Sequence, residues 1–127
     1  MASKSNTQRT LSALKDDPNV LRSWIVEKWQ AFAPQPGKPG RRGVRQDMFG
    51  IIDIVSLDRS KGVRGIQSTG TDFYGHRTAL LTDPDKRAAC IDWLSMPGTT
   101  LELWGWKKQK NRWTVKIQNF TLMDFLF

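Results

Sequence analysis

The chain has 127 residues, which is the length of one domain and leaves little room for a second. Twenty Lys and Arg residues against twelve Asp and Glu residues give a formal net charge of +8. A surplus this large on a small body creates a positive potential that favours phosphate-rich or anionic partners. Charge alone leaves open a basic protein that has no such partner.

Several classes of site and location are excluded or disfavoured by composition. Cys90 is the only cysteine, so an intramolecular disulfide and a thiolate metal cluster are both excluded, and we expect it to pack on a helix face. His76 is the only histidine, which excludes a histidine-rich zinc site and indicates an ordinary loop residue. The N-terminus lacks the apolar run of a signal peptide, and no stretch approaches transmembrane length. We therefore expect a cytoplasmic, intracellular protein that is not secreted and has no membrane partner.

The first part of the chain is polar up to its first proline. Residues 1–16 are rich in Ser and Thr and are expected to form a flexible N-terminal arm, which leaves 17–127 as a single domain. Asp17-Pro18 is typical of a helix start, and the apolar residues that follow are spaced for an amphipathic helix over 20–33. Residues 34–43 are rich in Pro and Gly and predict an irregular basic loop.

The remaining elements alternate between hairpins and a helix. The β-branched run 48–57 and the segment 63–69 predict a first β-hairpin, followed by a loop over 70–75. Asp83-Pro84 predicts a helix that ends near residue 95. A second hairpin is expected from two further strands and a tight turn, at 101–106, 112–119 and 109–111. The predicted fold is a single α/β domain with a mixed four-stranded sheet flanked by helices.

The first predicted hairpin contains an acidic residue in an apolar setting. Asp53 lies between Ile52 and Ile54, and burying it without a partner would be costly, so it requires a hydrogen-bonding partner or a metal ion. If the two strands pair, Asp53 and Gln67 converge near one edge. A carboxylate and an amide oxygen are suitable ligands for Mg²⁺. The alternative is a strand-end carboxylate bonded to an arginine or to backbone amides, with Gln67 as an ordinary polar strand residue.

Three segments follow one another in an order that is typical of one superfamily. They are a helix bearing Glu27, the run Asp47-Met-Phe-Gly-Ile-Ile-Asp53, and Gly65-Ile66-Gln67-Ser68-Thr69. Together with the helix and the segment Leu101–Lys108 that come next, this arrangement over 20–119 resembles the PD-(D/E)XK nuclease superfamily, and in particular its small phage and Holliday-junction-resolvase-like members. The resemblance implies a restriction-endonuclease-like order, α-β-β-α-β-β, and a homodimer.

The resemblance also implies roles for individual residues. Asp53 would be the principal ligand of Mg²⁺ or Mn²⁺, Gln67 the second ligand, and Glu27 the carboxylate that completes the metal shell. Asp47 would have a supporting role, and the alternative is that it caps a loop. The alternative for Glu27 is an exposed residue on a helix. The superfamily has a lysine two residues after Gln67, where this chain has Thr69. Arg77, Lys107 or Lys108 would then supply the positive charge, or activity would be weak or absent.

Basic residues indicate where nucleic acid would bind. In the second predicted hairpin, Trp104, Trp106 and Trp113 interleave with basic residues, which suits phosphate contacts and stacking on an unpaired base. The alternative is that the tryptophans form core and the cations keep the hairpin soluble. We expect nucleic-acid contacts from the basic loop over 34–43 and the residue just beyond it, from the second hairpin, and from one arginine between them. These residues are Lys38, Arg41, Arg42, Arg45, Arg77, Lys107, Lys108, Lys110, Arg112 and Lys116.

Three functional hypotheses follow from these patterns. The first is a metal-dependent endonuclease that hydrolyses phosphodiester bonds in DNA, with structure-specific cutting as one form of it and RNA as the alternative substrate. The second is a nucleic-acid-binding module that keeps the scaffold without catalysis, and Thr69 is the feature that favours it. The third is a protein-interaction domain whose second hairpin is buried against another polypeptide.

Overall fold

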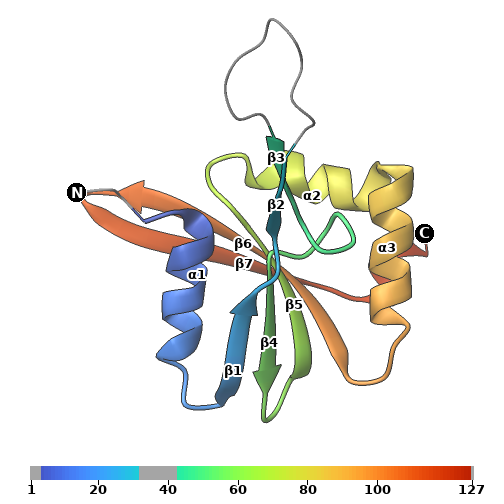
Figure 1. Ribbon diagram of the computed structural model, residues 1–127, viewed down its shortest axis with the longest axis horizontal. Coiled ribbons are helices and arrows are strands. Elements are labelled where there is room, and N and C mark those ends of the chain that lie inside the picture. Colours follow the sequence, from blue (N-terminus) through green and yellow to red (C-terminus); the bar gives the residue numbers. More distant parts are fainter. Residues whose placement is uncertain (1–3, 32–42, 127) are drawn as a thin grey trace, which may run out of the picture.

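A mixed five-stranded sheet forms the centre of the protein (Figure 1). The computed structural model describes residues 4–31 and 43–126. The sheet has the strand order β1-β4-β5-β6-β7, with bounds Val20–Ile25, Ile54–Asp58, Gly62–Thr69, Thr99–Gln109 and Arg112–Phe120. Strands β2 (Lys28–Ala31) and β3 (Gly43–Gln46) form a separate antiparallel pair. The helices are α1 (Asn6–Lys15), α2 (Phe73–Thr82), α3 (Pro84–Leu94) and α4 (Leu122–Phe125).

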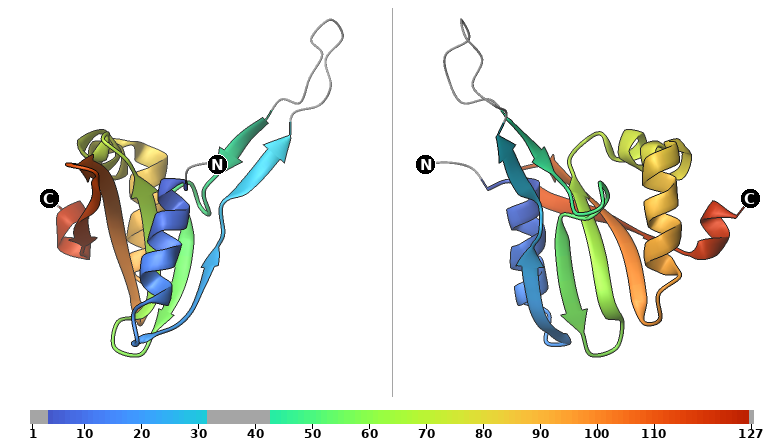
Figure 2. Two further views of the ribbon diagram at one scale, coloured as in Figure 1. Left: turned by 90° about the vertical axis from the view of Figure 1, so that its left-hand side faces the viewer. Right: turned by 45° about the vertical axis from the view of Figure 1, so that its right-hand side comes forward.

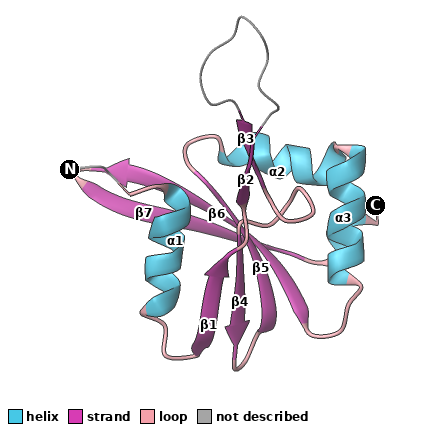
Figure 3. Ribbon diagram, in the orientation of Figure 1, coloured by secondary structure: helices cyan, strands magenta, loops and turns pink. Residues whose placement is uncertain are grey.

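The predicted α/β class, single domain and mixed sheet are confirmed, but the sheet has five strands rather than four. Strands β1, β4 and β5 are antiparallel, β5 and β6 are parallel, and β6 and β7 are antiparallel. Parallel neighbours need a crossover connection, and helices α2 and α3 provide it between β5 and β6. Figure 3 shows this alternation of helices and strands. Within the described part of the chain, no helix is both long enough and apolar enough to span a membrane.

The predicted helix over 20–33 is wrong, because strands β1 and β2 occupy its described part. The carboxylate of Asp17 does not cap a helix but accepts a hydrogen bond from the Asn19 amide at 2.9 Å, which turns the chain into β1. β1 then pairs with β4, and Trp24 is 76 % exposed. The segment is rich in Val, Ile and Trp, which favour strands. Its apolar spacing is compatible with the period of a helix and also with that of a strand.

The residues expected to form a flexible arm include helix α1. Ser5 accepts from the Gln8 amide while the Gln8 side chain accepts from the Ser5 amide, which is a capping box. Leu14 near the end of the helix is buried against the sheet. The Ser-x-x-Gln spacing of Ser5 and Gln8 is the signal in the sequence from which this helix could have been predicted.

Both predicted hairpins are confirmed. β4 starts at Ile54 instead of residue 48, because Met48 and Ile52 form an isolated bridge that turns the chain back on itself. In the second hairpin, Lys110 and Asn111 have φ values of 48° and 64°, which suits a two-residue turn. The helix predicted from Asp83-Pro84 is α3, whose cap Asp83 accepts from two backbone amides. Helix α2 was not predicted and begins inside the loop expected over 70–75.

The helices cover opposite faces of the sheet. On one face, Leu14 of α1 packs with Ile66, Trp104 and Trp106. On the other, α2, α3 and α4 enclose a core that includes Leu103. α3 approaches closely where the sheet lacks a side chain, since a Cβ on Gly65 would lie 2.9 Å from the Trp93 ring. Figure 2 shows the β2–β3 arm projecting away from this body.

A charged cluster is buried beneath α1. Arg64 donates to both carboxylate oxygens of Glu102, at 2.7 and 2.8 Å, and to Asp58 at 3.1 Å. All three residues are buried. The indole of Trp104 also donates to Glu102, at 3.1 Å. These bonds join β4, β5 and β6 at one end of the sheet.

We predict that Arg64→Met destabilises the protein by about 3–5 kcal/mol, because it leaves two buried carboxylates without their cation. Chemical denaturation measures this directly. Arg59 is exposed in the β4–β5 turn, and the control Arg59→Met should change the free energy of unfolding by less than about 0.5 kcal/mol. Equal effects of the two substitutions would contradict the prediction.

Candidate metal centre

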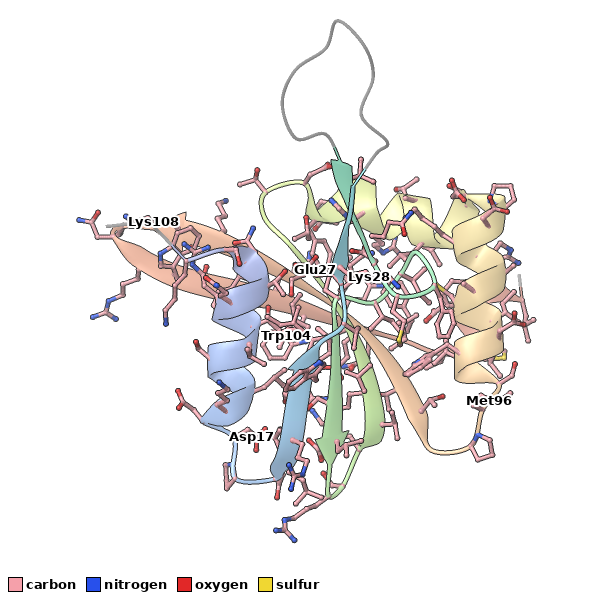
Figure 4. All side chains as sticks on the ribbon, in the orientation of Figure 1. Asp17, Glu27, Lys28, Met96, Trp104 and Lys108 are labelled. Atoms are coloured by element: carbon pink, nitrogen blue, oxygen red, sulfur yellow. The ribbon has the colours of Figure 1, made fainter. Side chains whose placement is uncertain are left out.

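Three carboxylates meet where the β2–β3 arm joins the sheet. Glu27 lies between β1 and β2, Asp47 follows β3, and Asp53 precedes β4. Each offers one oxygen, and these oxygens lie within 4.8 Å of one another. Figure 4 shows Glu27 at the base of the arm. The cluster therefore draws on two connections of the chain, β1–β2 for Glu27 and β3–β4 for both aspartates.

Backbone pairing explains why these acids meet. Lys28 pairs with Gln46 in the arm, so the residues just outside this pair, Glu27 and Asp47, start from adjacent positions. The amides of Val26 and Glu27 both donate to the Asp53 carbonyl, at 2.8 and 3.3 Å. These bonds fix the base of the arm beside the start of β4.

The turn over 47–52 brings Asp47 back towards Asp53. Phe49 and Gly50 have φ values of 57° and 76°, and the Met48 amide donates to the Ile52 carbonyl at 2.8 Å. We expected Asp47 in a supporting role or as a loop cap, but the structure includes its carboxylate in the cluster. The signal in the sequence was the short spacing of the two aspartates around a glycine.

Asp53 and Gln67 both contact Asp47. The Asp53 amide continues the β4–β5 ladder by donating to the Ile66 carbonyl at 2.9 Å, which puts Asp53 opposite Gln67. The Gln67 amide nitrogen donates to Asp47 at 3.3 Å. Asp47 and Asp53 interact through a side-chain hydrogen bond. The sheet thus brings the amide to the carboxylates, as the strand alternation predicted.

The oxygen of the Gln67 amide is a buried acceptor without a donor. Gln67 is 3 % exposed, and its Oε1 accepts no hydrogen bond from the described residues. A buried polar atom in this condition costs about 1–3 kcal/mol. The same amide contacts Asp47 through its nitrogen, so this oxygen lies next to the acidic cluster. It is a hard donor atom available to a cation.

Burial and neighbouring charge keep Asp53 protonated. Burial raises its pKa most, and the hydrogen bond and negative charge of Asp47 raise it further, as does the charge of Glu27. The Ser68 amide, which donates to Asp53 Oδ2 at 2.7 Å, opposes these effects. The resulting pKa is about 9. At neutral pH a proton therefore occupies a position where a cation would also relieve the repulsion.

The donor set fits a hard divalent cation. Three carboxylates and one amide supply oxygen ligands only, which suits Mg²⁺ or Mn²⁺ completed by water. A cation bound there lowers the pKa of its water molecules and neutralises charge on a phosphate oxygen. Such a site can assist hydrolysis of a phosphate ester.

The structure distributes the predicted nucleic-acid contacts over several elements. Lys107, Lys108, Lys110 and Arg112 are exposed at the tip of the β6–β7 hairpin, where Figure 4 shows Lys108. Lys38, Arg41 and Arg42 lie outside the described residues, as does the side chain of Arg45 in β3.

The other two predicted contacts lie where α2 meets β7, and both have partners there. Arg77 of α2 donates to Gln118 of β7 at 2.9 Å, and Lys116 of β7 donates to the Tyr74 hydroxyl. His76, expected in a loop, lies in α2. Both cations therefore join a helix to the edge of the sheet.

Thr69 lies where the superfamily has its lysine, and it is 5 % exposed. Gly105 of β6 is its neighbour in the parallel ladder, and Lys107 follows two residues later on the same face. Arg77 is bonded to Gln118. Of the two lysines expected to replace the superfamily lysine from β6, the register puts Lys107, and not Lys108, on the same face as Thr69.

Comparison of the chain with models of protein families, with curated proteins and with solved structures found no significant match.

We predict that the metal-free protein becomes less stable as the pH rises from about 4 to about 9, because Asp53 must lose a proton that folding holds tightly. Asp53→Asn removes this dependence. At the alkaline end of this range the variant should be more stable than the wild type by at least about 1.4 kcal/mol, the equivalent of one pKa unit.

Thermal unfolding in a chelator across this pH range measures both proteins. Asp92→Asn, which removes one exposed carboxylate from α3, is the matched control and should keep the wild-type slope. A wild-type stability that is flat or rises over the interval would contradict the assignment of this proton.

Proposed function

We propose that this protein is a metal-dependent nuclease that hydrolyses phosphodiester bonds in DNA. The observation that carries the proposal is the group of Glu27, Asp47 and Asp53 beside the unpartnered amide oxygen of Gln67. Hydrolysis of phosphate diesters commonly uses hard cations held by such oxygens. The net charge of +8 supports a polyanionic substrate.

The order of the elements supports membership of the PD-(D/E)XK superfamily as part of this proposal. A helix and a strand, α1 and β1, precede the strand that follows Asp53. The next strand, β5, carries Gln67, and two helices and a parallel strand follow it. The departures are Thr69 in place of the lysine, the β2–β3 pair between β1 and β4, and the position of Glu27, which lies after a strand instead of on a helix.

In the proposed mechanism, a Mg²⁺ or Mn²⁺ ion supplies Lewis acidity and an ionised water. Asp53 would hold the ion through its carboxylate, which the Ser68 amide keeps in place by donating to Oδ2. Gln67 would offer Oε1, the unpartnered oxygen of the amide whose nitrogen donates to Asp47. Hydrolysis would join a water oxygen to phosphorus and break one P–O ester bond, and the leaving oxygen would take up a proton from solvent.

Two projections flank the proposed site. The β2–β3 arm leaves the body at Glu27, and the β6–β7 hairpin extends past the end of β5 (Figure 1). The hairpin tip is cationic, with Lys107, Lys108, Lys110 and Arg112 exposed. Phosphates of a strand that enters between the two projections would meet these cations and contribute salt-dependent affinity.

The test is incubation of the purified protein with branched, single-stranded and duplex DNA in Mg²⁺ or Mn²⁺. We predict metal-dependent cleavage of at least one substrate, and a loss of more than about 100-fold in Asp53→Asn, because removing a ligand should cost at least as much as removing a residue that orients one. Asp92→Asn is the matched control and should cleave at the wild-type rate.

A second candidate function rests on Thr69, which cannot neutralise a phosphate as a lysine does. It is a nucleic-acid-binding module without catalysis. Tight, salt-sensitive DNA binding without cleavage in either metal would establish this candidate and overturn the nuclease. The same assay with RNA separates the two polymers. Failure to bind either one at moderate salt would overturn both functions.

A further inference from the structure

A groove lies between α1 and the extended part of the β6–β7 hairpin. Its volume is about 510 Å³, and its lining includes Lys4 and Arg9 on one side and Trp106 and Trp113 on the other. One carboxylate, Asp16, also lines it. The groove is on the face of the sheet that α1 covers, beyond the last paired residue of β5.

Trp113 is the most exposed aromatic residue of this groove. It is 44 % exposed, whereas Trp106 on the neighbouring strand is 9 % exposed. The guanidinium carbon of Arg9 lies 3.5 Å from the centroid of the Trp113 ring. Trp113 pairs with Lys108 across the hairpin, so a second cation starts from the neighbouring strand position.

The groove is connected to the candidate metal centre through a chain of hydrogen bonds. The Trp106 indole donates to Thr10 Oγ1 at 2.8 Å, and the Ser68 hydroxyl donates to the same oxygen at 2.8 Å. The Ser68 amide donates to Asp53. Thr10 is fully buried, so the groove wall and the carboxylate are held in a fixed relation.

Charge decides what kind of occupant fits. Among the lining residues, Lys4 and Arg9 outnumber Asp16, so a second copy of the same groove would bring like charges together. A nucleotide offers a flat ring for the indole and a phosphate for the cations. Stacking on an indole is open to every base only when that base is unpaired.

We propose that this groove binds an unpaired nucleotide, whose base stacks on Trp113 in the position that the Arg9 guanidinium takes in the free protein, and whose phosphate is bound by the displaced Arg9 and by Lys4. The inference rests on the proposed function and narrows its substrate class to DNA that carries a single-stranded segment beside the cleavage point. Duplex DNA keeps its bases stacked internally and leaves Trp113 without a ligand.

The test measures binding of a fluorescent oligothymidylate and of a duplex by anisotropy, in a chelator so that no cleavage occurs. Trp113→Ala should weaken binding of the single strand about 10-fold, which corresponds to about 1.4 kcal/mol, and binding of the duplex less than about 2-fold. Trp113→Phe should retain most of the single-strand affinity because the ring still stacks. Trp24→Ala, which removes the 76 % exposed indole of β1, is the matched control and should change neither affinity.

Three results would overturn the inference. They are equal losses of single-strand and duplex affinity in Trp113→Ala, a loss of single-strand affinity in Trp24→Ala as large as that in Trp113→Ala, or unchanged single-strand affinity in both variants. Sedimentation that reveals a dimer disrupted by Trp113→Ala would assign the groove to a second copy instead. Cleavage lost in Asp53→Asn with single-strand binding intact in Trp113→Ala would refute this inference alone. Selective loss of binding in Trp113→Ala without any cleavage by the wild type would refute the nuclease alone.

Discussion

The burial of Asp53 beside two further carboxylates is the constraint on which the rest of this structure depends. Asp53 is 4 % exposed and lies beside Asp47 and Glu27, so its ionised form is unfavourable unless a positive charge accompanies it. The free protein meets this condition with a proton. The divalent cation that we propose would also meet it and would give the Gln67 oxygen a partner.

The scaffold holds this arrangement by polar contacts along β5. On the α1 side, Ser68 connects Asp53 to Thr10, and farther along the strand Arg64 joins β5 to Asp58 and Glu102. Because these groups are buried and bonded, the strand cannot shift without losing several hydrogen bonds at once. The proposed ligands therefore start from fixed positions, which lowers the entropic cost of binding a cation.

The sequence predicted those parts of the fold that local chemistry determines. Both hairpins and α3 followed from turn residues and from the Asp83-Pro84 start, and the convergence of Asp53 and Gln67 followed from strand alternation. The segment over 20–33 was misassigned because its apolar spacing suits either period, and only pairing with β4 decides between them. Glu27 was therefore placed on a helix. The full acidic cluster depends on the β2–β3 pairing, which no local pattern specifies.

Titration calorimetry of Mn²⁺ binding in buffers of different ionisation enthalpy tests the central claim most directly, because it counts the protons released. The account predicts release of close to one proton per bound ion at neutral pH, since Asp53 has a pKa of about 9 without metal. It also predicts that Asp53→Asn abolishes this release and most of the affinity. Binding that releases no proton, or that is equally tight in the variant, would contradict it.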